Sequence, residues 1–349
     1  MISTTIIISS LLIAVVLAAV FLERWSVPVI LVALGLGIVF GSDVLNLYDF
    51  GNVELTNSAA NLALVFILFH GGFGTKRGDF RAVALPAGGL ATWGVILTAL
   101  VSFLVLRYAL GWSFEHSLLL SVIISSTDAA AIFSILRRQS LPRRLSSTVE
   151  IESAANDPMA ILLTILAVQA VGSGASLGIK VLLSFAWKFV AGPLIGWALA
   201  RVSIWLFNRL NPQDRQHYYV LFVGVVLFIY SVTEAAHSSG ILAVFVAGFV
   251  MGNRPFVHKQ GVFNISAALS GIANVGMFVM MGLLVYPSQW ADLWHKGVAL
   301  FLVLTFVSRP IAVFLGTVGM GIPGKERLFI AWAGLRGAVP VVLATYPAA

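Results

Sequence analysis

The chain has 349 residues, of which 59% are hydrophobic and 10% charged, and its formal net charge is +7. Soluble domains carry about 25% charged residues, so this composition excludes an ordinary soluble domain and indicates a membrane protein with several spans. The sequence contains no cysteine, which excludes disulfides and metal sites built from thiolates. The first apolar run, Thr4 to Leu22, carries no charge and is long enough to cross a hydrocarbon core of about 30 Å.

Hydropathy predicts an all-α polytopic protein with twelve spans. The predicted segments are 4–22, 27–41, 57–74, 84–109, 114–135, 148–172, 176–207, 217–236, 239–252, 265–286, 297–319 and 325–348.

Basic residues alternate between the connecting loops. One set of loops holds 14 of the 21 lysines and arginines, including the cluster from Arg137 to Arg144, whereas the other set holds only Arg107, Lys180 and Lys296. Cytoplasmic loops carry the excess of basic residues, so the N-terminus is predicted to lie outside. The positive charge therefore indicates topology, and a nucleic-acid surface is the weaker interpretation because no soluble domain carries it.

An internal repeat is visible at an offset of 211 residues. This offset puts Gly37 and Gly41 on Gly248 and Gly252, and it puts Gly71 on Gly282. It also lays "SSTDAAA" of segment 114–135 over "RGAVPVV" of segment 325–348. Partner segments are separated by an odd number of spans and therefore cross in opposite directions, which is the plan of many secondary transporters.

The predicted repeats cover about 1–172 and 212–349, and a helix at 176–207 links them. The counterpart of the stretch from Glu150 to Thr164 would lie at 361–375, so we expect the last core helix to be absent from this sequence.

Segment 148–172 carries the strongest candidate site, in the stretch "ESAANDP". Glu152 and Asn156 are i,i+4 neighbours, as are Ser153 and Asp157, so the four side chains form one polar patch on a helix. Oxygen atoms of these types are the ligands that hard cations prefer, and ionisable groups inside membranes are usually functional. Asp157 is the carboxylate that we expect to bind a proton or a cation in turn.

Two further segments are predicted to contain breaks in their helices. Segment 114–135 has Ser125, Ser126, Thr127 and Asp128 in mid-span, and segment 325–348 has Gly334, Gly337 and Pro340 around Arg336. Non-helical backbone at membrane depth must line a cavity or be buried in protein.

The repeat brings the two breaks together. Arg336 is expected to pair with Glu152 or Asp128, and Arg309, beside Pro310, is expected to be a structural partner rather than a substrate ligand.

Three motifs in this order, "SSTDAAAIFSILR", "ESAANDP" and "GLRGAVP", make the chain resemble the NhaP-type monovalent cation:proton antiporters. The closest resemblance is to the potassium/proton branch, also called cell volume regulation protein A. It implies a thirteen-helix, NhaA/NhaP-like inverted-repeat fold with crossed discontinuous helices. The resemblance also implies a core (transport) part at about 57–172 and 265–349 and a dimerisation part at about 1–56 and 176–252, without the usual C-terminal cytoplasmic region.

The resemblance also implies roles for individual residues. Asp157 would be the exchange carboxylate, and Thr127, Asp128 and Ser153 would complete the ion site. Glu152 and Arg336 would form a structural pair. Asn156 stands where electrogenic relatives carry a second aspartate, which implies one-for-one, electroneutral exchange.

The expected function is alternating-access exchange of K⁺, or of Na⁺, for H⁺ across the bacterial inner membrane, serving cation, pH and volume homeostasis. We expect a homodimer in lipid that needs no cofactor and is not an enzyme. Two alternatives stay open: an intramembrane aspartyl hydrolase that uses Asp128 and Asp157, and a cation channel. The sequence does not determine the choice between K⁺ and Na⁺.

Overall fold

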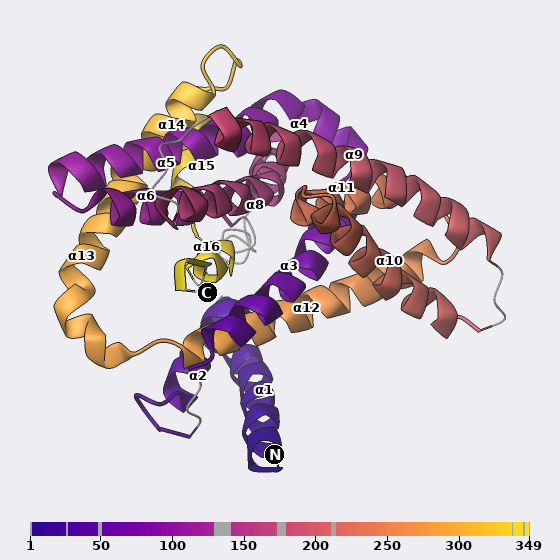
Figure 1. The fold of residues 1–349 in the computed structure, drawn as a ribbon, viewed down its shortest axis with the longest axis horizontal. Helices are drawn as coiled ribbons and strands as arrows, with labels where there is room; N and C mark the ends of the chain where they lie inside the picture. The colour runs from indigo at the N-terminus through magenta and orange to yellow at the C-terminus, as the bar shows by residue number, and fades with distance from the viewer. Residues whose placement is uncertain are drawn as a thin grey trace. The chain divides into compact units, whose positions relative to one another are not determined.

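A computed structural model describes residues 2–25, 27–47, 51–128, 141–172, 179–210, 214–336, 338–344 and 346–348 (Figure 1). Every regular element in these ranges is helical. The helices are α1 (Ile2–Leu22), α2 (Val29–Phe40), α3 (Val53–Gly74), α4 (Arg77–Gly89), α5 (Val95–Leu104), α6 (Phe114–Ile123), α8 (Arg143–Gly172), α9 (Ile179–Arg209), α10 (Gln216–Ala235), α11 (Gly240–Gly252), α12 (Lys259–Leu283), α13 (Trp290–Val303), α14 (Arg309–Gly316), α15 (Gly324–Trp332) and α16 (Ala338–Leu343). Short 3₁₀ turns lie at η1 (Glu23–Trp25), η4 (Pro287–Gln289) and η6 (Tyr346–Ala348), and π-helical turns at η2 (Leu90–Gly94), η3 (Val105–Ala109) and η5 (Leu304–Ser308).

Within the described ranges, eight helical stretches are long and apolar enough to cross a membrane, and α2, α6 and α11 are shorter apolar helices. The chain is therefore an all-helical, multi-pass membrane protein. The predicted span 84–109 is one continuous stretch, Arg77–Ala109, in which π turns interrupt the α-helix. The second half of the predicted span 114–135 lies outside the described residues.

The backbone forms two compact units, and the boundaries between them fall inside α3, α4, α8 and α12. Unit 1 comprises Met1–Ala60, Leu85–Ala160 and Asn274–Ala349, and unit 2 comprises Asn61–Ala84 and Ile161–Ala273. All the predicted site residues belong to unit 1. The predicted division into a transport part and a dimerisation part concerns function and stays a prediction.

In unit 1, α5 packs against both α6 and α14, and α14 packs against α15 (Figure 1). An apolar cluster holds the first half of α8 to η2, α14 and α15. Its fully buried members are Leu90, Leu145, Val149, Val313, Ile330, Ala331 and Ala333. The cluster fixes the part of α8 that leads directly into the predicted polar patch.

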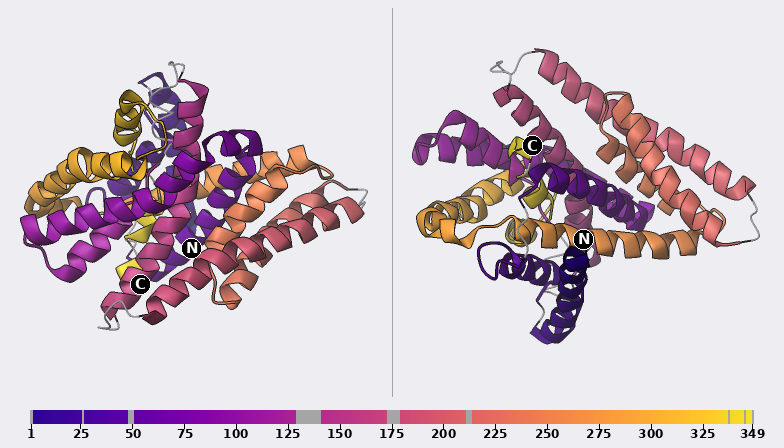
Figure 2. Two further views of the ribbon diagram at one scale, coloured as in Figure 1. Left: turned by 90° about the horizontal axis from the view of Figure 1, so that it is seen from above. Right: turned by 60° about the horizontal axis from the view of Figure 1, so that its bottom comes forward.

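In unit 2, α9, α10 and α11 pack side by side (Figure 2). Helices α9 and α11 lie so close together that a Cβ on Gly192 would be 2.8 Å from the Ser239 carbonyl oxygen. The absence of a side chain at this glycine permits the close contact. The Glu234 carboxylate accepts a hydrogen bond of 2.8 Å from the Gly240 N–H at the start of α11. This carboxylate satisfies one of the N–H groups that a helix N-terminus leaves without an intrahelical partner.

Each unit also contains a glycine crossing that has a similar crossing in the other unit. In unit 1, a Cβ on Gly37 of α2 would lie 2.5 Å from the Val279 carbonyl oxygen and 2.9 Å from the Gly282 Cα of α12. In unit 2, Gly248 of α11 meets the backbone of Phe69 and Phe73 on α3 in the same way. Small residues at such positions let helix backbones approach closely in membranes.

The Gly37 crossing predicts a stability difference between two neighbouring glycines. We expect Gly37→Ala to lower the thermal unfolding temperature of the protein purified in detergent, because overpacking costs about 1–3 kcal/mol. Gly35→Ala on the same helix is the control, since nothing lies within 4 Å of a Cβ at that position. Equal unfolding temperatures for the two variants would contradict a tight α2–α12 crossing.

Candidate functional site

Two non-helical segments, called breaks below, meet in unit 1: residues 124–128 after α6, and residues 333–336 between α15 and α16. Helix α6 ends at Ile123, and the backbone from Ile124 to Asp128 is not helical. Helix α15 ends at Trp332, and α16 begins at Ala338. The Asp128 N–H donates a 2.7 Å hydrogen bond to the Leu335 carbonyl oxygen, so the two breaks contact each other directly. Backbone groups outside a helix have no intrahelical hydrogen bond, and at membrane depth there is no water to replace it. Here the carbonyl group of one break accepts the hydrogen bond of the N–H group of the other.

Helix α8 supports the first break with two polar side chains. The Asn156 Nδ2 donates to Thr127 Oγ1 at 2.6 Å, and the Asn156 Oδ1 accepts a longer bond of 3.4 Å from the Thr127 N–H. The Ser153 Oγ donates to the Thr127 carbonyl oxygen at 3.0 Å. All three residues are buried. The i,i+3 spacing of Ser153 and Asn156 therefore presents both side chains to the same residue of the break.

Asp157 follows on the same helix, and α8 continues through Pro158. The Asp157 carboxylate lies beside Ser126 and Asp128 of the break. Asp157 is partly exposed, whereas Glu152 and Asn156 are 1% and 0% exposed. The structure thus brings Thr127, Asp128, Ser153 and Asp157 together, and among the carboxylates of α8 in this site Asp157 is the accessible one.

Glu152 pairs with Arg309. The Arg309 Nη2 lies 2.5 Å from Glu152 Oε1, and the two side chains are 2% and 1% exposed. The ion-pair partner of Glu152 is therefore Arg309 and not the predicted Arg336, although Glu152 also lies within electrostatic range of Arg336. A structural role for Arg309, as opposed to that of a substrate ligand, stays a prediction. Removing one member of such a buried pair costs about 3–5 kcal/mol, because the other charge is left uncompensated.

Arg336 has a different role from the predicted one. Its Nε donates to the Ile124 carbonyl oxygen at 2.9 Å, and its Nη1 donates to the Gly334 carbonyl oxygen. Ile124 directly follows the end of α6, and Gly334 lies between α15 and α16. Carbonyl groups at such positions lack intrahelical donors. The guanidinium joins the two breaks because its several donors point in fixed, divergent directions.

Local helix geometry and packing position the Glu152–Arg309 pair. Arg309 follows the π turn η5 and precedes Pro310, which has no N–H to bond the Phe306 carbonyl. Val149 lies one turn before Glu152 on α8, and Val313 lies one turn after Arg309 on α14. Both valines belong to the buried cluster. The shared apolar cluster therefore helps to hold the two charges opposite each other.

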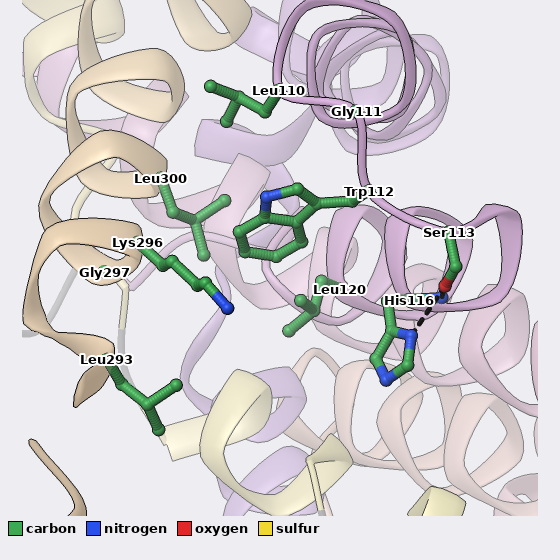
Figure 3. Close-up of a pocket in the computed structure, with 10 residues that line it drawn as sticks. All are labelled: Leu110, Gly111, Trp112, Ser113, His116, Leu120, Leu293, Lys296, Gly297 and Leu300. Atoms are coloured by element: carbon green, nitrogen blue, oxygen red, sulfur yellow. Dashed lines mark hydrogen bonds between the residues drawn. The ribbon is translucent and has the colours of Figure 1, made fainter.

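A cavity of about 720 Å³ lies elsewhere in unit 1 (Figure 3). It is lined from η3 through α6 and by α13, with Trp112, His116 and Lys296 among mostly leucine side chains. The His116 Nδ1 lies 2.6 Å from Ser113 Oγ. None of the predicted site residues is among those that line this cavity, so it is separate from the polar site.

Known proteins resemble this chain over nearly all its length. It is 36% identical to the K(+)/H(+) antiporter NhaP of Alkalimonas amylolytica over 346 residues, which are 99% of this chain and 60% of that protein. It is 34% identical over 354 residues to the K(+)/H(+) antiporter NhaP2 of a Shewanella species (strain MR-4), again covering 99% of this chain and 61% of the relative. The chain thus spans about three fifths of the length of these relatives.

The fold has a solved counterpart in the sodium proton antiporter MjNhaP1 from Methanocaldococcus jannaschii. The TM-score is 0.86 at 24% sequence identity, covering 98% of this chain and 86% of that one. The family described as "Sodium/hydrogen exchanger, transmembrane" matches residues 9–349. The contacting helix breaks and the polar patch on α8 therefore lie in a chain that belongs to the sodium/hydrogen exchanger family.

Proposed function

We propose that this chain is the membrane part of a monovalent cation:proton antiporter in which Asp157 binds the cation and the proton in turn. The observation that carries the proposal is that Asp157, a partly exposed residue, has its carboxylate beside Ser126 and Asp128, at the place where the two helix breaks contact each other. Exchange needs one site for which the two ions compete, and a carboxylate that takes up either a proton or a cation meets that need. Thr127, Asp128 and Ser153 supply further oxygen atoms for a cation. No catalytic chemistry or cofactor enters this mechanism.

The charges around the site support one-for-one exchange. Among the described residues of the site, with all five side chains counted as ionised, Glu152, Asp128 and Asp157 carry three negative charges. Arg309 and Arg336 carry two positive charges. The remaining charge is one negative, which a single monovalent cation or a single proton neutralises. Loaded with either ion, the site carries the same charge through the membrane, so the cycle is electroneutral.

The repeated glycine crossing supports inverted repeats and alternating access. Gly37 meets the backbone of Val279 in unit 1, and Gly248, its counterpart at the 211-residue offset, meets Phe69 in unit 2. Gly282 meets Leu34 and Ile38, as Gly72 meets Phe245 and Phe249. These contacts favour Gly72 as the counterpart of Gly282, one residue from the Gly71 of the sequence alignment. In such transporters the repeats move against each other around a fixed site.

The proposal extends to the ion, the membrane and the assembly. The names of the two relatives favour K⁺ as the exchanged cation, and the name of the solved counterpart keeps Na⁺ as the alternative. The basic loops favour an N-terminus outside the bacterial inner membrane, with a homodimer in lipid as the assembly. Membership of the exchanger family favours antiport over the aspartyl hydrolase and the channel.

The central test removes the charge of Asp157. In everted vesicles from cells that lack endogenous antiporters, the full-length protein should dissipate a preformed pH gradient when K⁺ or Na⁺ is added. Asp157→Asn should reduce this response to that of empty vesicles, because an amide neither releases a proton nor neutralises a cation. Glu115→Gln, at an exposed carboxylate of α6, should keep the wild-type rate. Wild-type exchange by Asp157→Asn would rule out the mechanism.

Electroneutrality predicts that exchange does not respond to voltage. Proteoliposomes of the full-length protein should reach the same cation distribution, for a given pH gradient, with and without an imposed potential. Each net charge moved would instead contribute about 2.3 kcal/mol per 100 mV, which is roughly a fifty-fold change in the equilibrium ratio. A shift of that size, measured with a fluorescent pH indicator, would show that the exchange moves net charge.

A further inference from the structure

The stem of Arg309 lies where a side chain at position 334 would be. A Cβ on Gly334 would lie 2.6 Å from Arg309 Nε and 3.0 Å from its Cδ and Cγ. Contacts below 3.0 Å essentially never occur between a real Cβ and a heavy atom. The arginine therefore crosses the backbone of the α15–α16 break directly over the Gly334 Cα on its way to Glu152.

Backbone conformation does not account for a glycine at this position. Among the described glycines, those with positive φ are Gly111, Gly319 and Gly321, so an alanine at position 334 can adopt the existing backbone. The constraint at position 334 is steric: the Arg309 side chain occupies the space that a Cβ would need.

Arg309 also has little freedom to move away. The side chain is 2% exposed and its Nη2 is bound to Glu152. The atoms that a Cβ would meet belong to the middle of the stem, not to a mobile end. Interiors are close-packed, so an inserted methyl group forces either the stem or the break to shift.

We propose that Gly334 is a positioning residue, whose missing side chain lets Arg309 reach Glu152 across the helix break. Glu152 lies on α8 directly before Ser153 and one turn before Asn156, the two residues that hold Thr127. Displacing Arg309 leaves a buried, unpaired carboxylate beside this contact and disturbs the ion site. The effect on transport rests on the proposed antiport function, whereas the effect on the ion pair does not.

The first measurement compares two glycine-to-alanine variants of the full-length protein. Gly334→Ala should lower the cation-driven rate of proton exchange at least tenfold and change its pH profile, because the Glu152 carboxylate loses its ion-pair partner. Gly276→Ala on α12, where nothing lies within 4 Å of a Cβ, should keep the wild-type rate and profile. Wild-type exchange by Gly334→Ala would overturn the proposal.

The second measurement asks whether Gly334 acts through Arg309. Arg309→Ala removes all three atoms that a Cβ at position 334 would meet, and Glu152→Gln removes the charge left behind. Gly334→Ala should lower the thermal unfolding temperature in the wild-type background and leave it unchanged in the Glu152→Gln/Arg309→Ala background, since mutations that share one contact are not additive. Equal losses in both backgrounds would mean that Gly334 acts through the backbone instead. This cycle needs no transport, so it stands even if the Asp157→Asn result rejects antiport.

Discussion

The structure of the site depends on the need to pair backbone groups at membrane depth. Water is absent from the hydrocarbon core, so each N–H and carbonyl group released by a helix break needs a partner from the protein. The two breaks meet part of this need for each other, through the Asp128 N–H with the Leu335 carbonyl and Arg336 with the Ile124 carbonyl. Helix α8 adds the contacts of Ser153 and Asn156 with Thr127. The breaks and α8 are therefore linked as one body, and a motion that separated them would leave several of these groups unpaired together.

The two arginines of the site compensate its negative charges in different ways. Arg309 neutralises Glu152 in a fully buried pair, which adds no net charge to the site. Arg336 is bound by carbonyl oxygen atoms, which carry partial charges only, so its full positive charge remains to offset one carboxylate at the breaks. This division leaves a single negative charge at the site, which the proposed ion would balance. A protein that paired Arg309 with Glu152 and Arg336 with Asp157 would have no unpaired carboxylate of α8 left at the site.

Much of the site could be predicted from the sequence because it depends on local spacing. The i,i+4 pattern of Glu152, Ser153, Asn156 and Asp157 and the polar or glycine-rich composition of the breaks are local signals. The partner of Glu152 is not local. Arg309 and Arg336 are both arginines in later spans, and the choice between them depends on the π turn before Arg309, on Pro310 and on the apolar cluster that includes Val149 and Val313. The repeat register shows the same limit, since Gly71 and Gly72 are equivalent in composition and only their contacts distinguish them.

Asn156 contributes more than the absence of a charge. Its amide donates to the Thr127 hydroxyl and accepts from the Thr127 N–H, so one side chain satisfies both a hydroxyl oxygen and a backbone donor of the break. An ionised aspartate accepts hydrogen bonds but cannot donate them. With aspartate at this position, the Thr127 hydroxyl would have to reverse its direction and donate, and its oxygen would then offer the cation a different lone pair. The amide therefore fixes the orientation of a proposed ion ligand while it keeps the site at one net negative charge, and both effects favour the exchange of a single cation for a single proton.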